Sequence, residues 1–313
     1  MEVVEGFVFI AGGGRFGSLA AKFFEQRRDV KVLLVDVRQD CPARRHAGLI
    51  AASLDSLDFR KGVNMLVSDA VEALTELLER GVVPELVVPA VPGHFAGKVF
   101  KNCLERRGFT VAPSKRLLEE ALRRLPKDVE LYVDEASSVI VCSYMPFNRR
   151  CKTPCPQPTV CPVTKRRREK PMFDLLREAV DADIVSILRS TLLTANVGAF
   201  SGRELVEALD ECVRRGGCTA AVGTACRCHG IINFFEVGRQ TETKKTNTHT
   251  SQRRQTVPRE QSGCSSTQPT MANSSINLPS SILLRVRLSA WGIDGLPSSI
   301  HSAIILPVTG PSM

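Results

Sequence analysis

The 313-residue sequence predicts an α/β protein: a doubly wound parallel sheet, then a smaller α+β domain, then a disordered tail. Three observations predict this organisation. Apolar runs alternate with amphipathic stretches up to about residue 118, which is the pattern of successive strand–helix units. Between residues 119 and 238 strands and helices follow in mixed order. From residue 239 onward regular periodicity disappears.

The first domain, residues 1–118, follows from its apolar spacing. A buried strand at residues 8–11 runs into a helix that begins near Arg15, where Phe16, Ala20 and Phe24 recur at helical spacing. A polar helical stretch is predicted after Asp36, and two further helices at residues 70–80 and 95–107. The remaining strands of this one parallel sheet are predicted at residues 30–35, 63–67, 86–91 and 109–112.

A glycine-rich turn connects the first strand to the first helix. Gly12, Gly14 and Gly17 have the spacing G-x-G-x-x-G. Gly12 permits the tight turn, Gly14 lets a diphosphate approach the backbone, and Gly17 lets the helix pack closely on the strand. The free N–H groups near Arg15 and Phe16, at the positive end of the helix, then bind the diphosphate. A Rossmann-like dinucleotide site is predicted; the alternative is a glycine turn that binds no nucleotide.

Asp36 ends the second strand about 20 residues beyond the motif. An acid at this position hydrogen-bonds the ribose 2′-hydroxyl and repels a 2′-phosphate, so NAD is expected rather than NADP. With the glycine turn and the segment Ser68-Asp69-Ala70, this region resembles the TrkA-N domain, also called the RCK N-terminal domain, of potassium-uptake systems. The resemblance implies that Asp69 and Ala70 lie near the adenosine, and that the domain binds NAD(H) and forms a homodimer. It also implies a membrane transporter as partner.

The second domain, residues 119–238, has a mixed pattern. Strands are predicted at residues 129–133, 138–143, 183–189 and 219–224, and helices at 171–180 and 202–215. Ser201 is the expected cap of the last helix, and Gly216 its end. The second half of the chain also loosely resembles an uncharacterised prokaryotic family with such a cysteine-containing domain.

Two groups of cysteines form the candidate metal site: Cys151, Cys155 and Cys161 in one proline-rich loop, and Cys226 and Cys228 in a turn that also contains His229. Thiolates favour zinc or an iron–sulfur cluster over hard cations, and the prolines hold the loop in a preset form. The spacings match no standard zinc-finger or ferredoxin pattern. A redox-active disulfide is the main alternative. Four other cysteines read as reduced thiols within elements: Cys103, Cys142, Cys212 and Cys218.

The bulk composition predicts a cytoplasmic protein. There is no basic leader at the start of the chain and no apolar run of the roughly 20 residues needed to span a bilayer, so neither a signal peptide nor membrane insertion is expected. The net charge of +9 invites a nucleic-acid partner. However, the densest basic run, residues 165–168, carries no interleaved aromatic residues and reads as a solvated loop, which argues against nucleic-acid binding.

Residues 239–313 are rich in Ser, Thr, Gln, Asn and Pro. Such a segment buries too little apolar surface to offset its ordering entropy and is predicted to be disordered. The change in composition after residue 237 is so abrupt that a frameshifted reading of the gene is a further interpretation of this tail.

Three functions remain open on the sequence. The first is an NAD(H)-binding regulatory or redox-sensing protein with a cysteine-ligated metal site, related to potassium uptake through the resemblance. The second is an NAD-dependent oxidoreductase, with a tetrapyrrole as one substrate to test and His94, just past the fourth strand, as a candidate proton donor or acceptor. The third is a structural zinc domain attached to a nucleotide-binding domain. No catalytic residue is assigned.

Overall fold

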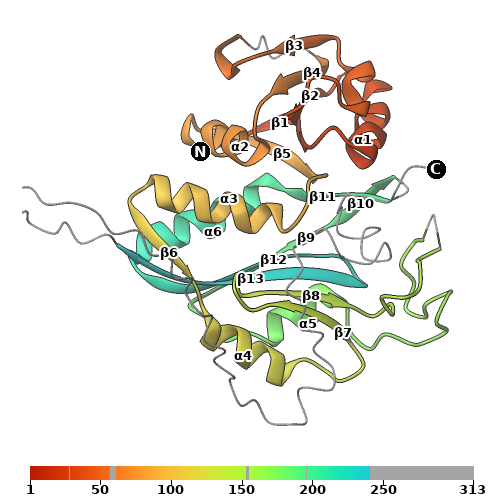
Figure 1. Cartoon of the computed structure of the whole chain (residues 1–313), viewed down its shortest axis with the longest axis vertical. Helices are drawn as coiled ribbons and strands as arrows, with labels where there is room; N and C mark the ends of the chain where they lie inside the picture. Colours follow the sequence, from red (N-terminus) through yellow and green to blue (C-terminus); the bar gives the residue numbers. More distant parts are fainter. Residues whose placement is uncertain (28, 57–60, 153–154, 195, 240–313) are drawn as a thin grey trace, which may run out of the picture. The chain divides into compact units, whose positions relative to one another are not determined.

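The first sheet is built around the strand that precedes the glycine turn. The computed structural model describes residues 1–239, except residues 28, 57–60, 153–154 and 195. The central strand β1 (Glu2–Ala11) pairs in parallel with β2 (Lys31–Asp36) and β5 (Val82–Pro89). Beyond β2 lie β4 (Gly62–Val67) and the short edge strand β3 (Leu49–Ala51), both parallel. Beyond β5 lie β11 (Val197–Ser201), which is antiparallel to β5, and β10 (Thr191–Thr194), which is antiparallel to β11. The strand order is therefore β10-β11-β5-β1-β2-β4-β3 (Figure 1).

Helices cover both faces of this sheet because its strands alternate their side chains. Val8 and Ile10 of β1 face α1 (Arg15–Glu25), whereas Phe7 and Phe9 face the opposite core cluster. That second face is covered by α2 (Ala70–Glu79) and α3 (Phe95–Arg106). The strands bury apolar residues on both sides, which is typical of parallel strands between helical layers.

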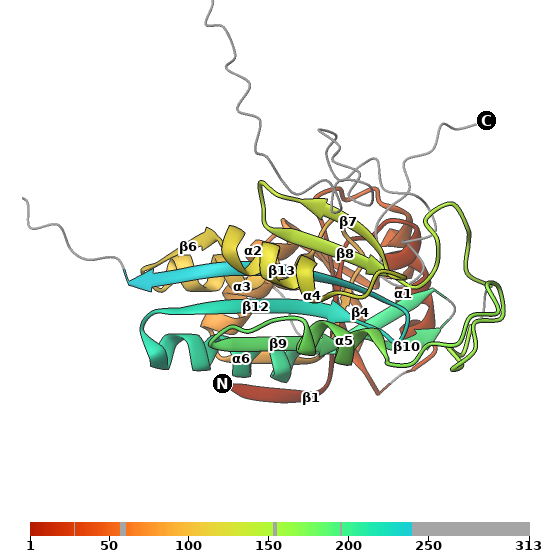
Figure 2. The same ribbon diagram turned by 90° about the horizontal axis from the view of Figure 1, so that it is seen from below.

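The second sheet has six strands, ordered β7-β8-β13-β12-β9 with β6 pairing to β13. In chain order they are β6 (Phe109–Pro113), β7 (Glu130–Asp134), β8 (Val139–Ser143), β9 (Ile184–Arg189), β12 (Cys218–Ala225) and β13 (His229–Arg239). α3 and α6 (Gly202–Arg215) lie between the two sheets, and α4 (Lys115–Arg124) and α5 (Met172–Glu178) cover the far face of the second sheet (Figures 1 and 2). The protein is therefore a mixed α/β protein with two mixed sheets and, within the described residues, six α-helices.

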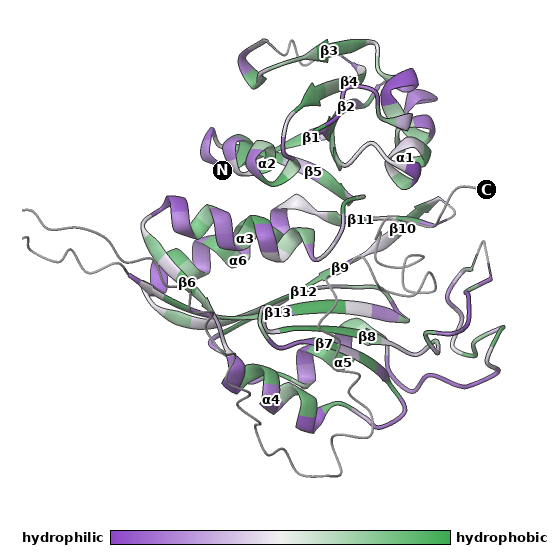
Figure 3. Cartoon of the chain, viewed as in Figure 1, coloured by the Kyte–Doolittle hydropathy of each residue, from purple (hydrophilic) through white to green (hydrophobic). Residues whose placement is uncertain are grey.

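α3 connects the two sheets through aromatic packing. Phe95 stacks on Phe9 of the first sheet at 6.2 Å between ring centroids, and Phe100 stacks on Phe235 of the second at 5.8 Å. One core cluster therefore contains residues from both of the domains predicted from the sequence, and the hydrophobic strands of both sheets face this layer (Figure 3). The boundary at residue 118 remains a prediction. The predicted tail lies outside the described residues, apart from its first residue, Arg239, which ends β13.

Two predictions about elements are wrong. Residues 109–112 do not continue the first sheet: β6 pairs antiparallel with β13, from Phe109 opposite Arg239 to Pro113 opposite Phe235. Its alternation of buried and exposed residues fits a one-sided antiparallel strand rather than a strand buried on both faces. The polar stretch after Asp36 is no α-helix but a short 3-10 turn, η1 (Pro42–His46), followed by β3.

Other local predictions are confirmed. α6 spans the predicted residues, and Gly216 ends it in the left-handed conformation with φ of +73°, although the Ser201 side chain makes no capping bond. Five helices and strands were not predicted from the sequence: α4, β3, β10, β11 and β13. Among the described residues, no helix combines the length and apolar character needed to cross a membrane.

Candidate functional sites

The glycine turn has the local geometry that its spacing predicts. Gly12 has φ of +91°, which disfavours any residue with a side chain. A Cβ atom on Gly17 would lie 1.8 Å from the Gly12 carbonyl oxygen, so only glycine lets α1 approach β1 this closely. A Cβ atom on Gly14, in contrast, would meet nothing within 4 Å. Gly14 is also the N-cap of α1 and makes no side-chain cap, so the backbone here faces open space at the helix N-terminus.

Asp36 lies against this turn. Its Oδ2 accepts a hydrogen bond from the Gly13 N–H at 2.6 Å, and its Oδ1 accepts one from the Arg38 N–H at 2.8 Å. The carboxylate thus already contacts the loop that would hold a diphosphate. The Arg38 guanidinium lies 4.0 Å away and is exposed.

Cys41, which belongs to none of the predicted motifs, is buried behind the glycine turn. Its sulfur would lie 2.2 Å from a Cβ atom on Gly13, and the adjacent Ala43 N–H donates to the Gly13 carbonyl at 2.9 Å. Burial, followed by the charge of Asp36, raises the pKa of Cys41. This thiol therefore supports the turn as a neutral packing group.

The other predicted cofactor residues are placed by α1 and α2. Arg15 is exposed at the first position of α1, whereas the Phe16 side chain packs into the core, which leaves its backbone for any ligand. Asp69 caps α2 by accepting hydrogen bonds from the Val71 and Glu72 N–H groups, and Ala70 is buried. The contact of Asp69 with an adenosine remains a prediction.

His94 is a buried structural residue. Its Nδ1 lies 2.7 Å from Asn233 Oδ1, and its Nε2 lies 3.1 Å from Thr224 Oγ1. Burial lowers the pKa of His94 to about 4, so the ring is neutral, donating to Asn233 and accepting from Thr224. Because both ring nitrogens are engaged within the protein, the ring in this conformation has no free nitrogen for a substrate.

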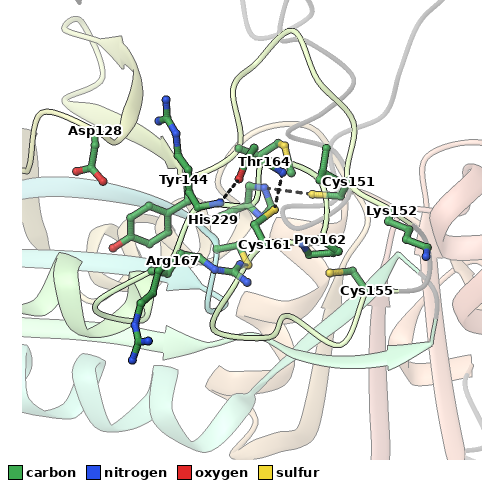
Figure 4. A pocket seen from close by; sticks show the side chains of 15 residues that line it. Asp128, Tyr144, Cys151, Lys152, Cys155, Cys161, Pro162, Thr164, Arg167 and His229 are labelled. Carbon is green, nitrogen blue, oxygen red and sulfur yellow. Dashed lines mark hydrogen bonds between the residues drawn. The ribbon is translucent and has the colours of Figure 1, made fainter.

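The predicted cysteine groups come together although they are about 75 residues apart in the chain. Cys151, Cys155, Cys161, Cys228 and His229 line one pocket of about 20 Å³ (Figure 4). Cys226 lies beneath it, buried at the turn between β12 and β13. His229 is central, since its Nε2 lies 3.7 Å from the Cys151 sulfur and its Nδ1 3.8 Å from the Cys226 sulfur. The fold therefore joins both groups around one imidazole.

Hydrogen bonds polarise this cluster. A hydrogen bond from the Cys228 thiol lowers the pKa of Cys226 well below its usual value. Burial by itself would raise this pKa, and the hydrogen bond with His229 lowers it further. The bond between Cys228 and Cys226, with burial, raises the pKa of Cys228. Burial by itself would lower the pKa of His229, but its bonds to Cys151 and Cys226 outweigh burial and raise that pKa to about 9. The arrangement is a thiolate–imidazolium pair with a neutral thiol beside it.

Arg168 adds a positive charge that the sequence analysis assigned to a solvated loop. Its side chain is buried, with 8% of the residue exposed, and its Nη1 donates to the Cys228 sulfur. Its Nη2 has no hydrogen-bond partner among the described residues. The run at residues 165–168 contains four basic residues, and no local pattern shows that only the last one turns inward.

The thiols are gathered but not closed around a point. Within the described part of the chain, no three His, Cys, Asp or Glu side chains converge closely enough to hold one metal ion. Cys161 instead accepts a hydrogen bond from the Thr164 N–H at 3.5 Å. Burial would raise the pKa of Cys161, but the hydroxyl and N–H of Thr164 outweigh it and lower that pKa. Cys212 and Cys218 form a separate pair, with sulfurs 3.1 Å apart.

Comparison with known proteins connects the chain to one archaeal relative. A protein of Archaeoglobus fulgidus, described as an uncharacterized protein, is 33% identical over 230 residues, covering 72% of this chain and 98% of the relative. A family model described as "Uncharacterized protein, C-terminal domain" matches residues 99–238, which include both cysteine groups. No solved structure matches. The expected similarity to an uncharacterised prokaryotic family is thereby confirmed, and the chain belongs to the family of this Archaeoglobus protein.

Proposed function

We propose that this chain is an NAD(H)-binding redox or regulatory protein with a cysteine-ligated metal site in its second sheet. One observation carries the proposal: five thiols and an imidazole from two distant segments gather beside a buried arginine. Structural thiols are usually dispersed, whereas thiolates clustered in a reduced compartment are typical of metal or redox chemistry.

The residues around the thiols suit an anionic metal–thiolate group. A buried guanidinium without a carboxylate partner is costly. Among the described residues, Arg168 Nη1 donates to the Cys228 sulfur and Nη2 has no hydrogen-bond partner. Zinc or an iron–sulfur cluster held by Cys151, Cys155, Cys161 and Cys228 would place negative charge next to Arg168. His229 and Cys226 would be additional ligands, because the His229 ring lies 3.7 Å from the Cys151 sulfur and 3.8 Å from the Cys226 sulfur. Such a group would supply electron transfer if it contained iron, and a structural crosslink if it were zinc.

The nucleotide part of the proposal rests on the first sheet. The four parallel strands have the order β5-β1-β2-β4, so β2 and β4 lie on one side of β1 and β5 lies on the other. In Rossmann-like sheets the dinucleotide binds where the strand order reverses in this way, in the crevice outside the carboxyl ends of the strands. The glycine turn lies at that edge, with Asp36 from the next strand beside it. These features support the Rossmann-like interpretation. The finer assignment to the TrkA-N domain, with its transporter partner, rests on the motif alone.

A second candidate is a metal-free dithiol centre. Cys226 and Cys228 lie in one turn, and the Cys228 N–H donates to the Cys226 sulfur at 3.4 Å. In addition, the described side chains do not converge on a metal position. A thiolate beside an imidazolium is the arrangement of reactive redox cysteines. In this case an external two-electron oxidant would join the Cys226 and Cys228 sulfurs in a disulfide, and the thiol protons would be released.

Metal analysis of the full chain, purified without oxygen, separates these candidates. Iron with sulfide indicates a cluster, stoichiometric zinc indicates a structural or ligand site, and the absence of both supports the dithiol. We expect Cys151→Ser to lose bound metal and Cys103→Ser, a buried thiol of α3, to retain it. Equal metal content in both variants would contradict the assigned ligands.

Titration with NADH tests the nucleotide site separately. Binding without turnover supports a regulatory role, and hydride transfer to an added acceptor supports an oxidoreductase. No binding at millimolar NADH, near a free energy of about −4 kcal/mol, would remove the nucleotide part of the proposal.

Replacing Arg168 is expected to weaken the metal site without unfolding the chain. Arg168→Met keeps the apolar stem but removes a charged donor to Cys228, an interaction worth about 1.5–3 kcal/mol, so metal affinity should fall by roughly tenfold or more. Arg167→Met, one residue earlier and exposed, is the matched control. The measurement is competition with a chelator, and equal competition by both variants would contradict the role of Arg168.

A further inference from the structure

A pocket of about 260 Å³ lies between the start of α3 and the second sheet. The pockets among the cysteines measure about 20 and 30 Å³, so this one offers far more room. Its volume is close to the lower end for small-molecule sites, about 300 Å³. It belongs to neither of the sites described above, because no cysteine and no residue of the glycine turn lines it.

The pocket has an apolar wall formed by side chains of β6, β8 and β13. Phe235 and Val111 belong to the main core under α3 and α6. Val141 and Ile231 form a small separate cluster on β8 and β13, with Val139 packed against it. All five side chains line the pocket. Such a surface favours a ligand with an apolar body.

The polar side chains at the floor of the pocket are His94 and Asn233, which already have hydrogen-bond partners. His94 and Asn233 are hydrogen-bonded to each other at 2.7 Å, and Asn233 Nδ2 donates to the Ser137 carbonyl at 3.4 Å. Gly97 lies directly against this pair, since a Cβ atom there would be 2.3 Å from Asn233 Oδ1. These polar groups are therefore already paired within the protein.

The rim of the pocket is basic. Lys98 and Lys101 are exposed on α3 and line the pocket three residues apart, which is one helical turn. Lys98 donates to the Pro92 carbonyl at 3.1 Å, and Lys101 forms an ion pair with Glu105 at 3.4 Å. Both contacts are exposed to solvent, so a ligand can replace them at little cost. Asp134 is the acidic residue of the lining, and its Oδ1 accepts from the Ala136 and Ser137 N–H groups. Two cations thus face one engaged carboxylate.

We propose that this pocket binds a small organic anion, with its apolar ring against β8 and β13 and its acid group at Lys98 and Lys101. The site goes beyond the nucleotide and metal proposals and stands without them. Two of its residues are close in the chain to those sites: His94 follows Ala90 and Val91, which pack on Gly12, and Asn233 follows the Cys226–His229 turn. A ligand here contacts β13, which begins at His229 of the cysteine turn, whereas no residue of β1 or α1 lines the pocket.

Fluorescence titration of the full chain with anilinonaphthalene sulfonate tests this site. The probe carries one sulfonate on an aromatic body, and phenylnaphthylamine is the same ring system without the charge. We expect the anionic probe to bind, and the double variant Lys98→Gln, Lys101→Gln to weaken it by about tenfold, the effect of about 1.4 kcal/mol. Lys22→Gln, an exposed lysine of α1, of which no residue lines this pocket, should leave binding unchanged.

Steric variants locate the bound probe. Val139→Trp fills the pocket from β8, and Ala136→Trp does so from an exposed position that tolerates a large side chain. Either change should abolish binding while the melting temperature stays near that of the wild type. Undiminished binding in a folded tryptophan variant, or equal affinity for the charged and neutral probes, would overturn the proposal. Metal content and NADH binding are measured on the same samples, so failure here is distinct from failure of the proposed function.

Discussion

A Gly14→Ala variant is expected to fold like the wild type and to bind NADH at least about tenfold more weakly. Gly14 has φ of −66° and ψ of −158°, which alanine also adopts, and the added methyl group meets no atom within 4 Å. That open space is where the diphosphate has to approach the backbone, so the methyl group would separate the ligand from the N–H groups of α1. Isothermal calorimetry measures the affinity, and thermal unfolding checks the fold.

Gly17→Ala is the matched comparison, because its effect should fall on the fold. Its methyl carbon would lie 1.8 Å from the Gly12 carbonyl oxygen, so α1 must shift away from β1. Overpacking of this kind costs about 3 kcal/mol, which lowers the melting temperature by roughly 6–12 °C in a chain of this size. If Gly14→Ala binds NADH as tightly as the wild type does, the diphosphate does not lie at this turn.

His94 should make the chain lose stability in acid between about pH 6.5 and pH 4. Burial, with the nearby charge of Lys98, lowers the pKa of His94 in the folded state to about 4 from 6.5. The unfolded chain therefore takes up a proton first as the pH falls. The stabilisation is fully present above pH 6.5 and is lost as the pH falls towards 4, and it amounts to about 3 kcal/mol.

The pH dependence is measured by denaturant unfolding across this range in the wild type and in His94→Gln. Glutamine keeps a polar side chain near Asn233 and Thr224 but does not titrate. The variant should be less stable than the wild type at neutral pH. Its stability should fall less in acid, because glutamine takes up no proton and only the carboxylates, which both proteins share, still titrate. Parallel curves for the two proteins would show that the neutral state of His94 does not support the fold.

Much of the first sheet could be predicted from the sequence because its signals are local. The turn at Gly12 and the left-handed end of α6 at Gly216 follow from the backbone conformations that glycine permits. The close contact of Gly17 follows from its lack of a Cβ atom. The apolar runs of β1, β2 and β4 identified strands because residues buried on both faces leave a continuous pattern. Even the position of Asp36 beside the turn follows from parallel strands ending at one edge.

The pairing of strands could not be read in the same way. β6 follows α3 directly, where the alternation of strands and helices predicts another strand of the first sheet, yet it pairs with β13, from Phe109 opposite Arg239 to Pro113 opposite Phe235. β13 itself went unpredicted although ten of its residues follow the cysteine turn directly. Which partner a strand takes depends on packing against helices such as α3, and a strand's own residues do not encode that choice.

By itself, the sequence determined the local chemistry: a glycine turn suited to a diphosphate, an acid beside it, and two groups of thiols. Only the tertiary structure decided which of these groups meet. It placed His229 between Cys151 and Cys226, turned Arg168 rather than Arg167 into the protein, and engaged both nitrogens of His94. It also brought α3, β6, β8 and β13 together around one pocket. The physical reason is that backbone conformation follows from neighbouring residues, whereas burial, charge pairing and cavities arise from contacts between distant ones.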